Sequence, residues 1–211
     1  MELLIDSSTR YAFVAISDQG EISSEISWRS EQNHSVELVP AVRLLMKRAN
    51  VTPKDIEAMF VAIGPGGFSA VRVGISFAKS FSVARDVPLV GVNTLYLEAY
   101  PYIGLGKPVC SVITAGRNKY YVGHFDNKEI RDTETDAKYG VESEQQLIDG
   151  ICDNTLVCGE GLTSAKDMIT NAMGSSVTVA RIHLPTRRPS SLASLGYGKW
   201  VDSNLVCLFP H

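Results

Sequence analysis

The sequence predicts an α/β protein built on β-sheets of mixed strand direction, and three observations support this class. Of its 211 residues, 45% are apolar, which is enough for a packed core in one large domain or two small ones. A hairpin signal lies near the start of the chain, and two strand–helix units follow it. A hairpin joins antiparallel strands, whereas helices between strands imply parallel crossovers, so both directions are expected.

The first third of the chain supplies the elements of this sheet in order. Asp18-Gln-Gly20 is a tight-turn signal between the strands Tyr11–Ser17 and Glu21–Trp28, which should pair as a hairpin. The other expected elements are the short apolar run Leu3–Asp6, the helix His34–Ala49, the strand Ala58–Ile63, the helix Phe68–Ala84 and the strand Val87–Val92. The resulting order, β-β-β-α-β-α-β, is shared by actin-like folds and sugar kinases.

The composition shifts to turn formers at Gly104-Leu-Gly-Lys-Pro108, and the predicted domain boundary lies there. Residues 1–103 should form an N-terminal subdomain and residues 104–211 a divergent C-terminal one that repeats the β-β-β-α-β-α order. Its expected elements are strands at Val109–Thr114, Lys119–Phe125, Glu129–Asp132 and Thr155–Cys158, and helices at Glu142–Gly150 and Leu162–Met173. A last helix, Ser190–Val201, should pack on the first subdomain, and the end through Phe209-Pro-His211 should be frayed.

Charge and cysteine content exclude several classes of protein. The net charge is −3 and the pI about 5.8, which disfavours tight nucleic-acid binding by the chain alone. The cysteines form no CxxC pair, so reduced, mostly buried thiols are expected rather than a zinc ribbon; they are Cys110, Cys152, Cys158 and Cys207. The sequence shows no signal peptide and no apolar run of roughly 20 residues, so a cytoplasmic location without membrane contact is expected.

Two loops have the chemistry of an anion site. The first is the turn formed by Asp6, Ser7, Ser8 and Thr9, where backbone N–H groups and hydroxyls could face a phosphate. The second is Gly64-Pro-Gly-Gly67, whose glycines Gly64, Gly66 and Gly67 join a strand to a helix N-terminus, a position that favours negative charge. An ordinary polar turn and an ordinary glycine turn remain the alternatives.

The sequence contains no metal or nucleophile set. His34 begins a helix, but a helix-borne metal site of the HxxxH type needs a second ligand at i+4, where Leu38 stands. No G-x-S-x-G motif is present. The only candidate for a second acidic phosphate motif is Ile148-Asp-Gly150, at an expected helix end, and Gly159-Glu-Gly161 follows a short strand as either an adenine-side turn or a simple one. We therefore expect no catalytic residues, no metal and no tightly bound cofactor.

The two helices of the first third each have two apolar stripes. One stripe on each, through Leu38 and Leu45 and through Phe77 and Phe81, should face the sheet. The second stripes should line a protein–protein interface, although burial under the second domain is the alternative. The residues of this expected interface are Val36, Val39, Arg43, Met46, Val71, Ile75 and Ala78.

The glycine loop and several shorter segments of the chain resemble those of a known protein family. Gly64-Pro-Gly-Gly-Phe-Ser-Ala-Val-Arg-Val-Gly74 looks like the GPGSFTGLRIG pattern of the TsaB (YeaZ) proteins. The opening through Asp6-Ser-Ser-Thr9, the segment His34–Pro40, Gly159-Glu-Gly161 and the late Arg188-Pro-Ser-Ser-Leu-Ala193 fit it in the same order. The match covers the first hundred residues well and the rest loosely.

This resemblance implies an actin-like (ASKHA, ribonuclease H-like) subunit without activity of its own. Such a subunit would pair, through its first two helices, with a TsaD-type paralogue that carries the metal. With a TsaE-type ATPase, the assembly would make N6-threonylcarbamoyladenosine in tRNA. The resemblance thus implies tRNA contact only through the complex, and it leaves open both a homodimer and weak ATP or ADP binding in the complex.

One element departs from the family pattern. The family usually has Asp-Ala-Arg near the start of the second domain, where this chain has Thr114-Ala-Gly-Arg117. Three alternative functions remain: a small ATP-dependent phosphotransferase, supported by Asp6–Thr9 but lacking a clear second acidic motif; a metallopeptidase, which lacks ligands; and a homodimeric binding module.

Overall fold

The computed structural model describes residues 1–31, 33–126 and 137–202. The described chain divides into two compact units, residues 1–94 with residues 188–202, and Leu95–Arg187. The second unit thus begins ahead of the Gly104–Pro108 turn at which the sequence analysis places the boundary. The expected strand Glu129–Asp132, the residue Cys207 and the end through His211 lie outside the described residues.

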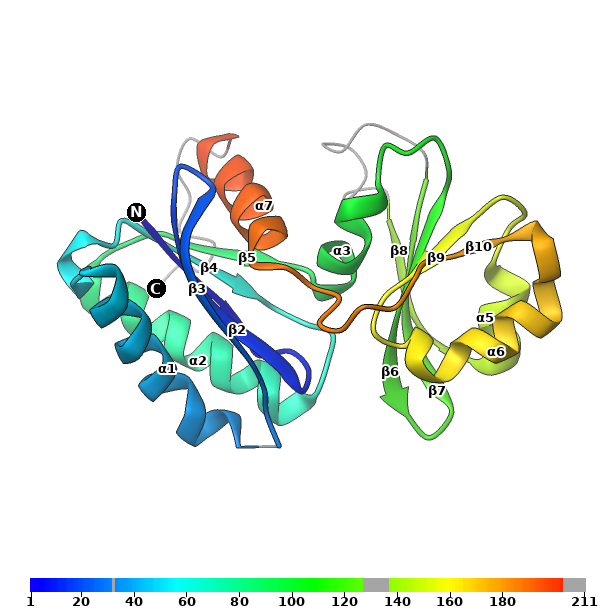
Figure 1. Ribbon diagram of the computed structural model, residues 1–211, viewed down its shortest axis with the longest axis horizontal. Helices are drawn as coiled ribbons and strands as arrows, with labels where there is room; N and C mark the ends of the chain where they lie inside the picture. The colour runs from blue at the N-terminus through cyan, green and yellow to red at the C-terminus, as the bar shows by residue number, and fades with distance from the viewer. Residues whose placement is uncertain (32, 127–136, 203–211) are drawn as a thin grey trace. The chain divides into compact units, whose positions relative to one another are not determined.

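The first unit contains a five-stranded sheet in the order β3-β2-β1-β4-β5 (Figure 1). β2 pairs antiparallel with both β1 and β3, whereas β4 pairs parallel with both β1 and β5. The strands are β1 (Glu2–Asp6), β2 (Tyr11–Asp18), β3 (Glu21–Arg29), β4 (Ala58–Ala62) and β5 (Leu89–Val92). The expected mixture of strand directions is therefore confirmed.

The predicted hairpin joins β2 to β3. Asp18 pairs with Glu21 across a loop of two residues, Gln19 and Gly20. Both loop residues have positive φ, 51° and 81°, as a two-residue turn that matches the twist of the strands requires.

Helices cover both faces of this sheet. On one face lie α1 (His34–Ala49) and α2 (Phe68–Arg85), and on the other lies α7 (Pro189–Asp202), as Figure 1 shows. The helix expected at Ser190–Val201 is thus confirmed, and it packs against β3, β4 and β5 of the first unit. Between α1 and β4, a short 3-10 turn, η1 (Pro53–Asp55), is closed by a reciprocal Thr52–Asp55 capping box.

The packing of α2 differs from the stripe that the sequence predicts. Its fully buried residues are small, Gly74, Ala78 and Ser82, one helical turn apart. Phe77 and Phe81 lie beside this stripe, half-buried and stacked, with ring centroids 6.1 Å apart. Small side chains let the helix backbone lie close to the sheet, so the large rings pack at its flank.

The second unit repeats the sheet order. Its strands follow the order β8-β7-β6-β9-β10, which corresponds strand by strand to β3-β2-β1-β4-β5. The strands are β6 (Val109–Gly116), β7 (Lys119–Phe125), β8 (Lys138–Ser143), β9 (Leu156–Cys158) and β10 (Thr178–Val179). The helices are α3 (Thr94–Ala99), α5 (Glu144–Gly150) and α6 (Leu162–Met173), with 3-10 turns η2 (Tyr100–Tyr102) and η3 (Gly174–Ser176).

Three elements of the second unit were not predicted. α3 follows β5 directly, β10 is two residues long, and β8 occupies Lys138–Ser143, where the sequence suggested a loop and the start of a helix. Tyr139 and Val141 alternate with polar residues or glycine along β8, but both are exposed, so this short alternation does not mark a buried face. None of the helices in the described part of the chain has the length and apolar content needed to cross a lipid bilayer.

Candidate functional site

The structure brings the two expected anion loops into direct contact, so that each occupies the space in front of the other. The Gly67 N–H donates a hydrogen bond of 2.8 Å to the Ser8 carbonyl oxygen. A Cβ atom at Gly66 would overlap that same carbonyl, so the close approach requires glycine there. A Cβ at Gly74 would come within 2.5 Å of the Ser7 hydroxyl oxygen. The glycines therefore bring the α2 backbone to the β1–β2 turn, and one amide of the expected nest already has a partner.

Polar groups of the β1–β2 turn are used within the chain. The Asp6 carboxylate accepts hydrogen bonds from the Ser8 N–H at 2.8 Å and the Ser8 hydroxyl at 2.5 Å. The Ser7 hydroxyl donates to the Ala70 carbonyl at 2.7 Å, and the Thr9 hydroxyl oxygen accepts from the Tyr11 N–H at 3.2 Å. Asp6, Ser7 and Ser8 are all buried. This turn has the bonding of a structural Asx turn.

His34 ties α1 to that turn. Its Nε2 lies 2.8 Å from the Thr9 carbonyl oxygen, an acceptor, so Nε2 carries the proton and Nδ1 can accept from the Ser30 hydroxyl at 3.4 Å. Leu38, at the i+4 position, is 1% exposed and belongs to the core. Within the described residues, no three His, Cys, Asp or Glu side chains lie close enough together to hold a metal ion.

The other phosphate-related motifs lie in the second unit. Asp149, in Ile148-Asp-Gly150, is at the end of α5 and accepts a hydrogen bond from the Gln145 amide at 2.8 Å. In the turn Gly159-Glu-Gly161, the Gly161 N–H donates to the Val112 carbonyl at 2.8 Å. The altered element Thr114–Arg117 leads into the β6–β7 hairpin, where Arg117 is exposed in the turn with φ 50°.

Sequence reasoning missed a buried ion cluster in this unit. Arg187, with its side chain 1% exposed, contacts Glu98 at 3.0 Å and Glu160 at 3.1 Å. The Glu98 Oε1 atom also accepts from the Thr186 hydroxyl at 2.8 Å and the Glu160 N–H at 3.2 Å. Burial raises the pKa of Glu98 despite the attraction of Arg187. These residues are up to 89 positions apart, and no local pattern links them.

The expected interface residues lie in two different environments. Val36 and Val39 are 67% and 40% exposed, and Arg43 is exposed as well. Met46 and Ala78, however, are buried in the core of the same unit, so both were wrongly placed on the outer stripe. Met46 follows Val42 by one helical turn and therefore shares its inward face.

Val71 and Ile75 are half-buried, and Ile75 packs against the same core. The outward side of α2 carries Arg72, Lys79 and Val83 instead. At about 100° per residue these three fall within about 40° of arc, centred about 120° away from the buried stripe of small residues. The outward residues of α2 can be identified from the sequence only when its inward face is known to consist of small residues.

A hollow of about 340 Å³ lies between α1 and α2. Its lining is mainly apolar, with the Arg72 side chain at its rim stacked over the Phe68 ring at 4.9 Å. The lining residues are Ser35, Leu38, Val39, Arg72, Val73, Ser76 and Phe77. Exposed valines beside an apolar hollow are the kind of surface that a partner protein covers.

Comparison with known proteins identifies relatives of this chain. The family model for "TsaD: tRNA N6-adenosine threonylcarbamoyltransferase" matches residues 25–144. The tRNA threonylcarbamoyladenosine biosynthesis protein TsaB of Bacillus subtilis (strain 168) is 27% identical over 202 residues, covering 93% of this chain and 87% of that protein.

Solved structures share the fold. YeaZ from Pseudomonas aeruginosa has a TM-score of 0.74 at 21% identity, covering 97% of this chain and 94% of that one. Ethanolamine utilization protein EutJ from Carboxydothermus hydrogenoformans has a TM-score of 0.56 at 14% identity, covering 92% and 89%. These neighbours confirm the actin-like fold class. The chain belongs to the TsaD family of tRNA N6-adenosine threonylcarbamoyltransferase proteins, as a TsaB (YeaZ) member.

Proposed function

We propose that this protein is the TsaB-like partner subunit of a TsaD-type enzyme in the formation of N6-threonylcarbamoyladenosine in tRNA. The observation that carries the proposal is the outward face of α1 and α2, where Val36 and Val39 are exposed next to an apolar hollow. A catalytic paralogue needs a metal pair on the first helix, and here His34 is hydrogen-bonded within the chain while Leu38 is in the core. The protein thus supports the reaction through assembly.

The proposed partners follow the same family relation. The TsaD-type paralogue binds the α1–α2 face, a TsaE-type ATPase joins the assembly, and tRNA is contacted only through the complex in the cytoplasm.

Nucleotide binding by the isolated chain is proposed to be weak or absent. The Gly67 amide and the Asp6 carboxylate already bond to Ser8, so a phosphate would have to displace these contacts. Calorimetry with Mg-ATP tests this, and low-micromolar affinity would contradict it. Steady ATP turnover by the chain alone would favour the alternative, a small phosphotransferase.

The assembly is tested by substitution at the exposed valines. Val39→Asp places a charge at the hollow and should abolish the complex with a TsaD-type protein of the same organism. In a reconstituted reaction, the same variant should also abolish formation of the modified adenosine. Val39 is a sharper site than Ile75, because Ile75→Asp would put a charge against the core and destabilise the subunit itself.

The matched control is Val201→Asp, which alters a valine 53% exposed on α7 of the same unit. Both variants should keep the wild-type circular dichroism spectrum. Complex formation by Val39→Asp at wild-type affinity would mean that the partner binds elsewhere.

A further inference from the structure

The outer face of strands β7 and β8 carries exposed aromatic and aliphatic side chains. Val122 of β7 packs into the core beneath α5 and α6, so by alternation Tyr121 points to the opposite face of the sheet. Across the ladder Tyr121 pairs with Val141, and Gly123 pairs with Tyr139. Tyr121 is half-buried, whereas Tyr139 and Val141 are 41% and 56% exposed.

This surface is cationic at one end. Lys119 is exposed and lies two residues before Tyr121, so it shares the outer face of β7. Arg117 is exposed in the turn that precedes it. Residues 114–123 contain these two cations and no acid. We call the surface the tyrosine face, made of Lys119, Tyr121, Tyr139 and Val141.

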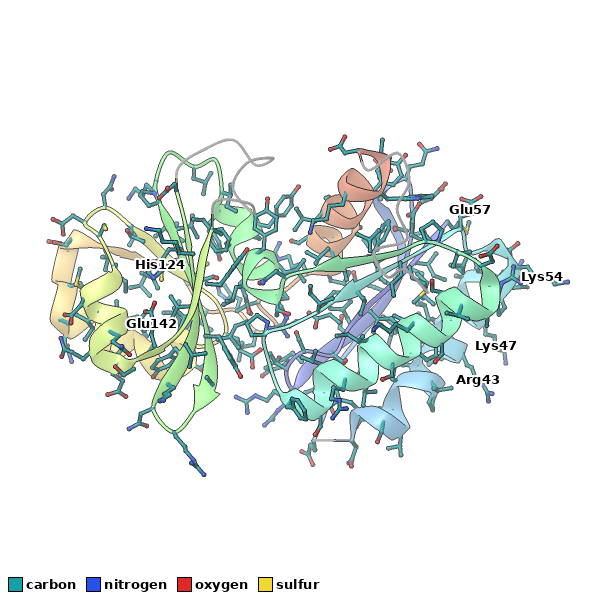
Figure 2. All side chains as sticks on the ribbon, turned by 180° about the vertical axis from the view of Figure 1, so that it is seen from behind. Arg43, Lys47, Lys54, Glu57, His124 and Glu142 are labelled. Atoms are coloured by element: carbon teal, nitrogen blue, oxygen red, sulfur yellow. The ribbon has the colours of Figure 1, made fainter. Side chains whose placement is uncertain are left out.

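The acid of β8 lies on the opposite face. The Glu142 Oε1 atom is 3.4 Å from the His124 Nε2 atom, and Figure 2 shows both residues on the side of the sheet that α5 covers. A Cβ atom at Gly150, at the end of α5, would come within 3.5 Å of the His124 ring. The charge on the tyrosine face is therefore of one sign.

The corresponding strand of the first unit has a polar outer face. β3 corresponds to β8 in the strand order of the two sheets. Ile26 and Trp28 of β3 pack against the core, whereas Glu25, Ser27 and Arg29 on its other face are exposed. A sheet face that meets only water is expected to be polar, so the apolar side chains of β8 indicate a contact with another molecule.

The exposed ring of Tyr139 is supported by buried rings. It meets the Phe125 ring edge-on, with centroids 5.9 Å apart, and Phe125 packs against Tyr96 of α3 at 5.7 Å. Phe125 and Tyr96 are both buried. A ring held in this way loses little conformational freedom when a ligand stacks on it.

The two tyrosines have the spacing of a stacking platform. Because Tyr121 pairs with Val141 and Tyr139 with Gly123, the tyrosines are diagonal neighbours on adjacent strands, about 7–8 Å apart. Sheet-based RNA-binding domains stack two or three unpaired bases on aromatic side chains placed on adjacent strands. Lysine and arginine beside such rings contact the phosphates of the same strand.

We propose that the tyrosine face binds unpaired nucleotides of the tRNA when this chain is part of its complex. The proposal rests on the assembly role proposed above and adds the surface of this chain that the RNA touches. Two local cations neutralise few phosphates, and the pI is about 5.8, so the isolated chain binds RNA weakly. The rest of the complex supplies the remaining contacts.

RNA fits this surface better than a protein partner does. A stable protein interface uses about 20–30 residues a side around an apolar centre. The apolar part of the tyrosine face consists of three side chains, two of them tyrosines, next to cations without an acid. Flat rings beside positive charge satisfy a base and its phosphate with few residues.

Removal of one ring provides the first test. In the complex with the TsaD-type protein, Tyr139→Ala should lower the affinity for an unmodified tRNA transcript at least about fivefold, because one stacked base loses its platform. Tyr139→Phe and Tyr139→Trp keep an aromatic ring and should retain the wild-type affinity. Fluorescence anisotropy at fixed salt measures these affinities, after gel filtration has shown that each variant forms the complex.

The matched control for this test is Leu105→Ala, which truncates a side chain 63% exposed in the same unit but outside the sheet. It should leave the tRNA affinity unchanged. Wild-type affinity of Tyr139→Ala, or an equal loss in Tyr139→Phe, would overturn the proposal.

Salt dependence provides the second test. The double variant Arg117→Gln, Lys119→Gln should flatten the slope of log affinity against log salt by about 1.4, since each phosphate contact on a single strand contributes about 0.7. The control Lys166→Gln, Arg181→Gln removes two other exposed cations of the same unit and should leave the slope unchanged. If the control flattens the slope as much, net charge is responsible and the tyrosine face is not.

The isolated chain provides a readout that does not depend on the complex. Titration with a short single-stranded oligoadenylate should shift the amide NMR signals of β7 and β8, and these shifts should disappear in Tyr139→Ala. Shifts confined to other parts of the chain would contradict the proposal.

The two proposals fail in different ways. If no complex with the TsaD-type protein forms, the assembly role is wrong, whatever the NMR titration shows. If the complex forms and modifies tRNA while the variants of the tyrosine face keep wild-type affinity, the assembly role stands and the RNA contact is wrong. Loss of TsaE-type ATPase binding by Tyr139→Ala, with unchanged tRNA affinity, would assign the face to a protein instead.

Discussion

Removing Arg187 should strongly destabilise the second unit. Arg187→Met keeps a long side chain but removes the guanidinium charge. Glu98 and Glu160, whose side chains are 1% and 11% exposed, then lack their cation. Breaking a buried ion pair from one side costs about 3–5 kcal/mol. At about 2–4 °C per kcal/mol for a chain of this size, the midpoint of thermal unfolding should fall by about 6–20 °C.

The loss should grow as the pH rises. Burial raises the pKa of Glu98, so the folded state favours the protonated acid and loses stability as the pH rises through that raised pKa. Without Arg187 the Coulombic attraction that opposes the shift is gone, and the pKa of Glu98 rises further. The cost of Arg187→Met should therefore be larger at pH 8 than at pH 5.

Urea unfolding followed by circular dichroism at both pH values measures this cost. The exposed neighbour Arg188→Met is the matched control and should change stability by no more than about 0.5 kcal/mol. Adding Glu98→Gln to Arg187→Met should recover part of the loss, since one buried charge is removed. A cost below about 1 kcal/mol, or one equal at pH 5 and pH 8, would refute the reasoning.

Two further predictions concern packing and thiol chemistry. Gly196→Ala should cost about 1–3 kcal/mol, because a Cβ there would overlap the Phe60 ring, whereas Gly198→Ala on the same helix meets nothing within 4 Å and should stabilise by about 0.5–1 kcal/mol. Thermal unfolding of the two variants tests this pair, and equal effects would contradict it. Burial raises the pKa of the Cys110 thiol, so maleimide labelling at neutral pH with peptide mapping should modify exposed Cys152 and leave Cys110 unmodified until the protein unfolds. Rapid native labelling of Cys110 would mean that the β6 region opens readily.

Local pattern was sufficient for the elements of the first unit. The hairpin at Asp18–Gly20, the helix His34–Ala49 and the last helix were predicted within one or two residues of their observed bounds. These elements depend on interactions within about four residues, which leave a periodic trace in the sequence. The same periodicity indicated a second apolar stripe on α1 and α2. The glycine pattern indicated the family.

Tertiary contacts decided what the pattern left open. The inward face of α2 proved to be the small residues Gly74, Ala78 and Ser82, because the backbone lies close to the β1–β2 turn. In the glycine loop, the Gly67 N–H donates to the Ser8 carbonyl and does not face an open anion site. Arg187 met Glu98, 89 residues away. Hydrophobic periodicity records which neighbours along the chain share a face, but it holds no record of partners far away in sequence, so only the folded structure determined these contacts.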